Sequence, residues 1–467
     1  MKKIFSLILV CLLITLTACG NTQNPPETTS NQQAAVLQAG FGKESITPDA
    51  PVGMRGYGDP DTRKSGVVLD PIYATCIAFH DGSQTFLVYT VDVCGLGETE
   101  TTYIRDYVTA FMDIPAENIF IGATHTHSAP QPFQDAAWDN ILVNACLNAA
   151  MAATADLAPI QLEATTATLE SMNFVRHYLM NDGTYYGSNF GSIASGFKAH
   201  ALEYPDRQIV LLKLNRTDKK DILMVNWQGH PASAARQDDY TGISADFVGY
   251  TRNALETETG MLVAYYTGAS GNTNTKSLIE SENVKNNNNY KDYGKQLAKE
   301  ILAILPNLTP MDGTDMKATR VAFEAEIDHS WDHMLKEANE VYEVWMYESQ
   351  SEGNTLGKKY GFTSGFQARA IRTRAALPAT QPRELRAFRV GPIGFTTGTY
   401  EMFSDHSQYV KENSPFDITF IITGCDGYIG NEASYTYRSY ESDTGMFASG
   451  TGEKIAAEYV KLLNAVK

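Results

Sequence analysis

The sequence predicts a layered α/β domain of the mixed α+β kind, and three observations carry this prediction. Short apolar runs rich in β-branched and aromatic residues alternate with amphipathic, helix-like segments. Neither an internal repeat nor a second linker interrupts the chain after its N-terminal region. The polar segments best suited to chemistry follow directly after strand-like runs, which is where open α/β sheets place their sites. We therefore expect one large domain or two fused lobes over residues 38–467.

The N-terminus has the features of an export signal. Lys2 and Lys3 precede an apolar run over residues 4–16, which is too short for a comfortable membrane span. The following Leu16-Thr17-Ala18-Cys19 resembles a bacterial lipobox, which implies a lipoprotein signal peptide over residues 1–18 and a lipidated Cys19. Ordinary signal-peptidase cleavage and an uncleaved anchor are the alternatives. The expected location is the extracytoplasmic side of a membrane.

The character of residues 19–37, the net charge and the cysteine spacing limit the kinds of binding partner and metal site that we expect. These residues are polar, contain proline and lack periodicity, which predicts a flexible tether. The net charge of −17 argues against nucleic acid as a partner and against membrane binding by charge. The cysteines of the body show no CxxC spacing, so they indicate neither a zinc knuckle nor a clear disulfide framework. They are Cys76, Cys94, Cys146 and Cys425. A zinc ion would have to be held by histidine and carboxylate.

The predicted elements follow in chain order. Apolar runs predict strands at residues 85–93, 118–123, 208–214, 222–227, 261–266, 387–391 and 417–423. Helical periodicity predicts helices at residues 98–112, 138–156, 246–256, 290–305, 330–347 and 452–465.

The most informative segment is residues 120–130, an apolar run that ends in His125-Thr126-His127. Strand side chains alternate between faces, so the pattern predicts that both imidazoles point the same way. Small neighbours leave room beside them. Imidazole is a common metal ligand, so the pair indicates a metal or proton-transfer site. The alternative is a hydrogen-bonded structural pair.

Further segments offer site residues, each with a structural alternative. His230 precedes Pro231 at a strand exit and is alternatively a core histidine. Glu401 lies in apolar surroundings, where a carboxylate must be paired or bound to metal; a salt bridge with Arg176 is the alternative. The small-residue loop 268–275 is alternatively only a turn. Segments 173–178 and 424–431 complete the set.

Arranged in order, these segments resemble the neutral/alkaline (non-lysosomal) ceramidase family over roughly residues 39–467. The resemblance rests on the His-x-His segment and on the sequence of the other motifs. These are Ser45-Ile46-Thr47-Pro48, Gly56-Tyr57, Ala123 to Pro130, Asn173 to Arg176, His230-Pro231, Ser244-Ala245-Asp246-Phe247-Val248-Gly249, Gly271 to Thr275, Thr399-Tyr400-Glu401-Met402-Phe403, Tyr440-Glu441 and Gly450-Thr451-Gly452-Glu453.

The resemblance implies zinc-dependent hydrolysis of an N-acyl amide, such as the amide of a ceramide, to a fatty acid and a sphingoid base by metal-activated water. It implies His125, His230 and Glu401 as the zinc ligands, an open arrangement typical of catalytic zinc. A tyrosine after Gly427 would be the fourth ligand. It places His127 and Arg176 in the substrate pocket, with His127 passing a proton to the leaving amine and Arg176 or a tyrosine stabilising the oxyanion.

Three departures qualify the resemblance. The family's Tyr-x-x-Tyr unit has Asn431 in its second place, so Tyr428, Tyr435, Asn431 or water remains open as the fourth ligand. The serine of the ceramidase loop is Asn274, which argues against an acyl-serine route. We count Asn274 and Tyr428 among the catalytic candidates. The sequence also ends after the catalytic motifs, without the family's C-terminal immunoglobulin-like domain.

Two other functions compete with this hypothesis. The first is a non-catalytic surface lipoprotein that keeps the fold as a binding module, which the asparagines at positions 272 and 431 favour. The second is a hydrolase of a different amide or ester, such as a cell-wall or sugar substrate. The zinc content and turnover separate the binding module from the enzyme. The sequence does not indicate an oligomeric state.

Overall fold

The computed structural model describes residues 36–57, 60–183, 185–187, 197–200, 204–275 and 289–467. Residues 36–467 form one compact unit. The predicted signal peptide, Cys19 and nearly all of the tether lie outside the described residues, so they stay predictions. Within the described ranges, no helix is long and apolar enough to cross a membrane.

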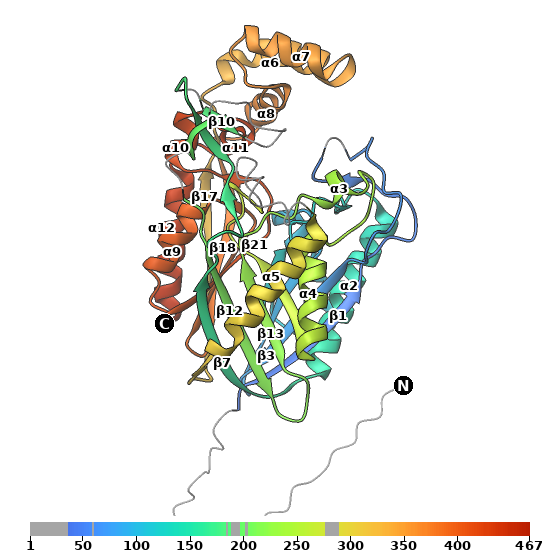
Figure 1. Ribbon diagram of the computed structural model, residues 1–467, viewed down its shortest axis with the longest axis vertical. Coiled ribbons are helices and arrows are strands. Elements are labelled where there is room, and N and C mark those ends of the chain that lie inside the picture. The colour runs from blue at the N-terminus through green and yellow to red at the C-terminus, as the bar shows by residue number, and fades with distance from the viewer. Residues whose placement is uncertain (1–35, 58–59, 184, 188–196, 201–203, 276–288) are drawn as a thin grey trace, which may run out of the picture. The chain divides into compact units, whose positions relative to one another are not determined.

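A nine-stranded mixed sheet is the larger of two β-layers (Figure 1). Its strand order is β14-β13-β12-β7-β1-β3-β4-β5, and β16 pairs with β7. The pairs β4–β5 and β13–β14 are parallel, and the other pairs are antiparallel. The strands are β1 (Gln38–Ser45), β3 (Tyr73–His80), β4 (Thr85–Val91), β5 (Ile119–Ala123), β7 (Ala158–Thr168), β12 (Gln208–Arg216), β13 (Ile222–Trp227), β14 (Leu262–Thr267) and β16 (Thr309–Met311).

A four-stranded sheet packs face to face on the large one. Its order is β17 (Met316–Glu326), β18 (Thr380–Val390), β19 (Ile393–Gly398) and β21 (Ile418–Thr423), of which β19–β21 is a parallel pair. Side chains from both sheets form one buried apolar cluster. In it the ring of Phe388 stacks on Phe120 at 3.8 Å and on Phe395 at 4.5 Å. This aromatic layer buries the facing surfaces of the two sheets.

Helices cover the two outer faces. α1 (Glu98–Met112) and α2 (Ala136–Ala155) pack on the β1-β3-β4-β5 part of the large sheet, and α4 (Asp246–Thr259) and α5 (Tyr290–Ile304) pack on β12-β13-β14. α9 (Ser404–Glu412) and α12 (Thr451–Val466) cover the small sheet. Four layers result, helix, sheet, sheet, helix, which confirms the predicted layered α/β fold (Figure 1).

This layering explains why the sequences of the inner strands are continuous apolar runs. In β4 the side chain of Val88 lies in the core between the sheets, whereas Tyr89 lies in the core under the helices. Both faces of such a strand are buried, so both alternating sets of side chains are apolar. The helix predicted at 98–112 and the strand predicted at 222–227 match α1 and β13 to the residue.

Two predicted elements differ from the structure by more than three residues at one end. The helix expected at 330–347 is a short 3₁₀ turn, Asp332–Met334, followed by α6 (Leu335–Tyr347). The strand expected at 387–391 begins earlier, because β18 spans Thr380–Val390. The first part of β18 pairs with β17 and is partly exposed, so it lacks the apolar run that marks a buried strand.

A helical insertion separates β17 from β18. It contains α6, α7 (Gln350–Lys359) and α8 (Gly365–Ala375), which stand at one end of the described unit (Figure 1). Its helices share a small apolar cluster of their own. The ring of Phe366 on α8 lies 6.0 Å from the ring of Tyr440 in α11 (Tyr440–Thr444). The insertion therefore reaches the segment that borders the candidate site.

Short elements complete the fold. A three-stranded sheet contains β9 (His177–Met180), β10 (Tyr185–Gly187) and β11 (Phe197–His200). The two-stranded pairs are β2 (Met54–Arg55) with β6 (Ala129–Pro130), β8 (Phe174–Val175) with β15 (Thr273–Asn274), and β20 (Glu401–Met402) with β22 (Tyr428–Ile429). The remaining short helices are α3 (Ala234–Gln237) and α10 (Glu432–Thr436).

Candidate metal centre

The candidate site lies where three of the parallel strand pairs end, β4–β5, β13–β14 and β19–β21. His125 follows the end of β5 at Ala123, His230 follows the end of β13 at Trp227, and Glu401 follows the end of β19 at Gly398. Parallel strands end at a common edge, so these side chains are delivered to one place from distant parts of the chain. The expectation that functional segments follow strand ends is confirmed.

The reasoning that placed the two histidines on one strand face is wrong, although their convergence is real. β5 ends at Ala123, and both histidines lie in the loop beyond it. His125 has a φ of 67°, a left-handed conformation that non-glycine residues adopt only when their surroundings hold them there. Its backbone N–H donates to the Val93 carbonyl at 3.0 Å. The loop, and not strand alternation, turns both rings toward the site.

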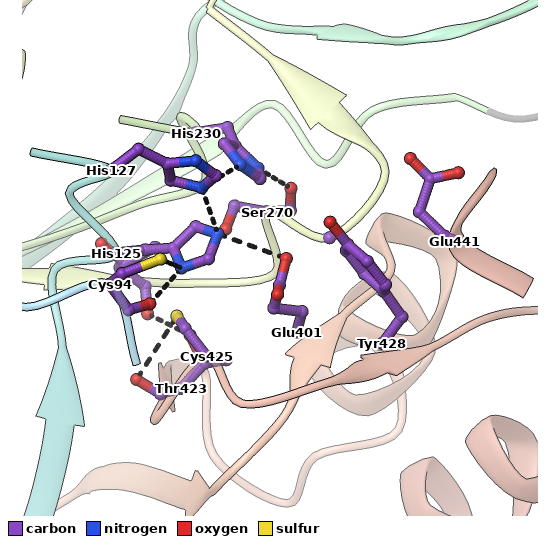
Figure 2. Close-up of polar contacts among 12 residues, drawn as sticks. Cys94, His125, His127, His230, Ser270, Glu401, Thr423, Cys425, Tyr428 and Glu441 are labelled. Atoms are coloured by element: carbon purple, nitrogen blue, oxygen red, sulfur yellow. Dashed lines mark hydrogen bonds and ion pairs between the residues drawn. The ribbon is translucent and has the colours of Figure 1, made fainter. Parts of the chain in front are cut away.

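Three imidazoles and one carboxylate converge there (Figure 2). The Nε2 atom of His127 lies 3.3 Å from that of His125 and 3.1 Å from that of His230. The Nε2 atom of His125 lies 3.2 Å from Oε2 of Glu401. Donor atoms of His125, His230 and Glu401 all lie within 4.8 Å of one another. Ligands bound tetrahedrally at about 2.0–2.2 Å from a zinc ion lie about 3.3–3.6 Å apart, close to these spacings.

The polar atoms of this cluster fit a metal ion. Glu401 is only 8% exposed, and the contact that the described residues give its Oε2 is the ion pair with Nε2 of His125. Nitrogen lone pairs that face one another in a buried space are unfavourable unless a proton or a metal cation lies between them. The carboxylate oxygen and the three facing Nε2 atoms therefore form a donor set suited to a metal ion.

Two of the three histidines also make the hydrogen bond through Nδ1 that metal-binding histidines usually make to a neighbouring carbonyl or carboxylate. Nδ1 of His125 lies 2.5 Å from the Cys94 carbonyl, and Nδ1 of His230 lies 3.0 Å from the Ser270 carbonyl. A proton on Nδ1 donated to a carbonyl leaves Nε2 free to bind metal. Nδ1 of His127 is buried and has no hydrogen-bond partner in the described part of the chain. The contacts of Nδ1 thus distinguish His125 and His230 from His127.

The surroundings of the three rings set different protonation states. Burial lowers the pKa of His125, but the charge of Glu401 outweighs it and holds that pKa well above its usual value. Burial, and then the charges of His125 and Arg176, hold the pKa values of His127 and His230 well below theirs. At pH 7 the metal-free protein therefore carries its proton on His125, beside Glu401, while the other two rings are neutral.

Tyr428 borders this cluster on the side of Glu401. In the β20–β22 pair, Glu401 and Tyr428 are direct cross-strand partners. Figure 2 shows the phenol beside Glu401 with its hydroxyl directed toward the histidines. Tyr435 donates instead to the Phe447 carbonyl at 2.5 Å, and the Asn431 side chain accepts from the Ser434 N–H at 2.8 Å. Of the three residues considered as a fourth ligand, only Tyr428 stands at the site.

Arg176 also reaches the site, but its ion-pair partner differs from the one considered. Nη1 lies 3.3 Å from Nδ1 of His230, and Nη2 lies 3.4 Å from the hydroxyl of Tyr428. Its salt bridge is with Glu441, at 2.7 Å from Nε, so the alternative of an Arg176–Glu401 pair is wrong. Asn274 lies in β15, half-buried and paired with β8. Within the described residues no hydrogen bond joins the Asn274 side chain to the histidines or to Glu401.

The comparisons with known proteins agree with this geometry. The sequence profile described as neutral/alkaline non-lysosomal ceramidase, N-terminal, matches residues 37–270, which is half of the chain. The chain belongs to this ceramidase family. No curated protein matches the sequence of this family member.

Two solved structures share the fold of this ceramidase-family chain. The neutral ceramidase from Pseudomonas aeruginosa superposes with a TM-score of 0.66 at 16% identity, covering 92% of this chain and 74% of that one. A ceramidase complexed with C2 superposes with a TM-score of 0.66 at 15% identity, covering 92% of this chain and 75% of that one. At such identities the likeness establishes the fold, and together with the profile match it confirms the predicted family.

Some residues of this ceramidase-family site escaped the sequence reasoning. Ser270 contributes a backbone carbonyl, for which a sequence has no signal, and Cys94 contributes its carbonyl and a sulfur 4.0 Å from Nδ1 of His125. The role of Glu441 depends on a partner far away in the chain. Gly56 belongs to a motif quoted above, and its φ of 108° suits glycine; a Cβ there would lie 2.7 Å from Cβ of His127. Because Gly56 has no side chain, the His127 side chain can pack directly against the backbone at this position.

Proposed function

We propose that this protein is a zinc-dependent hydrolase that cleaves the amide bond of an N-acyl lipid of the ceramide type. The observation that carries the proposal is the convergence of His125, His230 and Glu401 at the end of three parallel strand pairs. Two imidazoles and one carboxylate are a donor set that catalytic zinc uses. Membership of the ceramidase family supports an N-acyl lipid as the substrate.

The residues around that ion would have different roles in binding and catalysis. His125, His230 and Glu401 would hold it, with the hydroxyl of Tyr428 beside them. When bound, zinc supplies polarisation of the substrate carbonyl and acidification of a water molecule. The Tyr428 hydroxyl and Nη2 of Arg176, 3.4 Å apart, are donors on one side of the site, where they can stabilise a developing oxyanion. Burial lowers the pKa of His127, so its neutral ring can accept a proton at Nε2 from the water molecule and then give that proton to the leaving amine.

The asparagines that favoured a binding module have structural functions. Oδ1 of Asn272 accepts from the Ser404 N–H at 3.0 Å, and Asn431 caps the helix α10. Neither position therefore argues for a lost activity. We further propose that a lipidated Cys19 holds the enzyme at a membrane, which would keep the site close to lipid substrates. The mass of the mature N-terminal peptide tests this anchor.

The activity is tested with purified protein and a short-chain N-acylsphingosine. We expect one bound zinc per chain, release of free sphingoid base measured by mass spectrometry, loss of turnover after chelation, and recovery on addition of Zn²⁺. An ester and an N-acyl amino sugar serve as comparison substrates. Turnover that survives complete removal of metal would contradict the zinc mechanism, and preferred cleavage of the ester or sugar amide would contradict the ceramide-type substrate.

Metal binding is expected to release about one proton near neutral pH. The ligand histidines must be neutral to bind metal, and only His125 has a pKa raised above its usual value. Below that raised pKa the apparent metal affinity should rise about tenfold per pH unit. In the metal-free protein the same proton stabilises the fold at pH below about 6.5, and this contribution is lost as the pH rises through the raised pKa. Calorimetric titration in buffers of different ionisation enthalpy counts the protons; a count of zero would contradict the proposed proton on His125.

A further inference from the structure

A buried carboxylate behind the site joins two basic side chains. Oε1 of Glu441 lies 2.7 Å from Nε of Arg176, and Oε2 lies 2.7 Å from Nε2 of His177. Glu441 and His177 are 0% exposed, and Arg176 is 4% exposed. Arg176 and Glu441 are 265 residues apart in sequence; Arg176 lies between β8 and β9, and Glu441 lies in α11. Both carboxylate oxygens are thus used, one for each basic partner.

The contacts of Arg176 fix its guanidinium in one orientation. Its Nε side faces Glu441, while Nη2 donates to the Gly271 carbonyl at 2.8 Å. The two terminal nitrogens then point to the site, Nη1 toward His230 and Nη2 toward the hydroxyl of Tyr428. A guanidinium is planar and its donors form a rigid fork, so fixing the Nε edge fixes the direction of both other nitrogens.

Glu441 lies on the side of Arg176 away from the histidine cluster. Figure 2 shows it beyond Tyr428, with no dashed line to a histidine of the candidate metal centre. It therefore acts on the site through Arg176 and His177. A buried carboxylate costs free energy that apolar packing would avoid, so its presence here needs a reason beyond filling space.

The electrostatics of the site supply that reason. Nη1 of Arg176 lies 3.3 Å from a ring nitrogen of His230, so its positive charge stands close to the place where a metal dication would bind. Two positive charges at such a distance in a buried site repel each other. The carboxylate of Glu441 offsets the charge of Arg176 and leaves its donors in place.

We infer that Glu441 is a positioning residue, which orients Arg176 toward the substrate oxyanion and balances its charge beside the metal. The expected effect of Glu441 on catalysis rests on the proposed function. Its metal-binding part stands on the geometry of Arg176, Glu441 and His230 alone.

The Glu441→Gln substitution tests this inference, because it keeps the size of the side chain and removes the charge. We expect the Kd for Zn²⁺ to rise about tenfold, and kcat to fall about 10–100-fold while KM changes less than about threefold, the range seen when outer partners of a metal site are removed. In the double variant Arg176→Met/Glu441→Gln the Kd should return toward the wild-type value. In the Arg176→Met background, Glu441→Gln should cause no further loss of kcat.

Asp328→Asn is the matched control. It breaks a carboxylate–arginine pair in which Arg374 is buried and Asp328 is partly buried, with Nη1 of Arg374 at 2.9 Å from Asp328, and it should leave both Kd and kcat unchanged. If Glu441→Gln does not fold, Glu441→Asp carries the test: it keeps the charge, so Kd should stay within about twofold while kcat falls. An unchanged Kd and kcat in Glu441→Gln, or losses that add in the double variant, would overturn the inference.

Different experimental results would contradict the proposed function and the inference about Glu441. A wild-type protein that binds zinc but hydrolyses no N-acyl amide would contradict the proposed function, and the zinc affinities of the variants would still test Glu441. A wild-type enzyme with full activity and a Glu441→Gln variant with wild-type affinity and rate would contradict only the inference about Glu441.

Discussion

The His230→Ala variant is expected to lose its zinc and to fall at least about 1,000-fold in kcat/KM for N-acyl amide hydrolysis. A bound metal contributes several kcal/mol to the transition state, and each 1.4 kcal/mol is a factor of ten in rate. Removal of even an outer contact of a metal ligand costs about 10–100-fold in affinity, so loss of the ligand itself should cost more. Metal analysis by mass spectrometry and steady-state kinetics measure both effects.

His329→Ala provides the control for this variant. His329 lies outside the site, where its Nδ1 pairs with Asp332 at 2.8 Å, so its removal should change neither zinc content nor rate. The His230→Ala protein should remain folded, because the main loss is one hydrogen bond to the Ser270 carbonyl, worth about 1–3 kcal/mol when a buried partner is left unsatisfied. A folded His230→Ala protein that keeps a full complement of zinc would exclude His230 as a ligand.

The Asp92→Asn variant is expected to be less stable than the wild type by about 3–5 kcal/mol. Asp92 and Arg252 form a bidentate ion pair, with Oδ1 at 2.9 Å from Nη1 and Oδ2 at 2.6 Å from Nη2. Both side chains are buried, and Oδ2 also accepts the Tyr73 N–H at 2.9 Å. The substitution leaves the Arg252 guanidinium buried without its counter-charge. Urea denaturation measures the free energy of unfolding.

Lys454→Met serves as the comparison for an exposed pair. Lys454 and Glu326 are 53% and 51% exposed, and an ion pair of this kind contributes less than about 1 kcal/mol. Replacement of both buried partners, Asp92→Leu with Arg252→Met, should recover part of the lost stability because no charge then remains buried. Equal stability losses in Asp92→Asn and Lys454→Met would show that burial does not set the value of the Asp92–Arg252 pair.

Elements with a strong local pattern were predictable from the sequence, and those defined by packing were not. β13 is apolar on both faces and α1 has two glutamates in its first turn, so both were predicted with correct bounds. β1 escaped because glycines occupy it where α2 lies closest. A Cβ at Gly40 would lie 2.0 Å from the Ala153 carbonyl oxygen, and one at Gly42 would lie 1.9 Å from that of Ala149. Glycine there permits close helix packing and removes the apolar signal of a strand.

The sequence by itself determined which side chains could bind a metal and near which strand ends they stand. His125, His230 and Glu401 were named from residue type, neighbours and the order of motifs, and these are local properties of the chain. Only the tertiary structure decided that they meet. It also replaced the expected strand geometry of His125 with a left-handed loop and gave Arg176 the partner Glu441. The physical reason is that strand pairing brings together segments hundreds of residues apart, and a local pattern carries no information about which distant residue will face it.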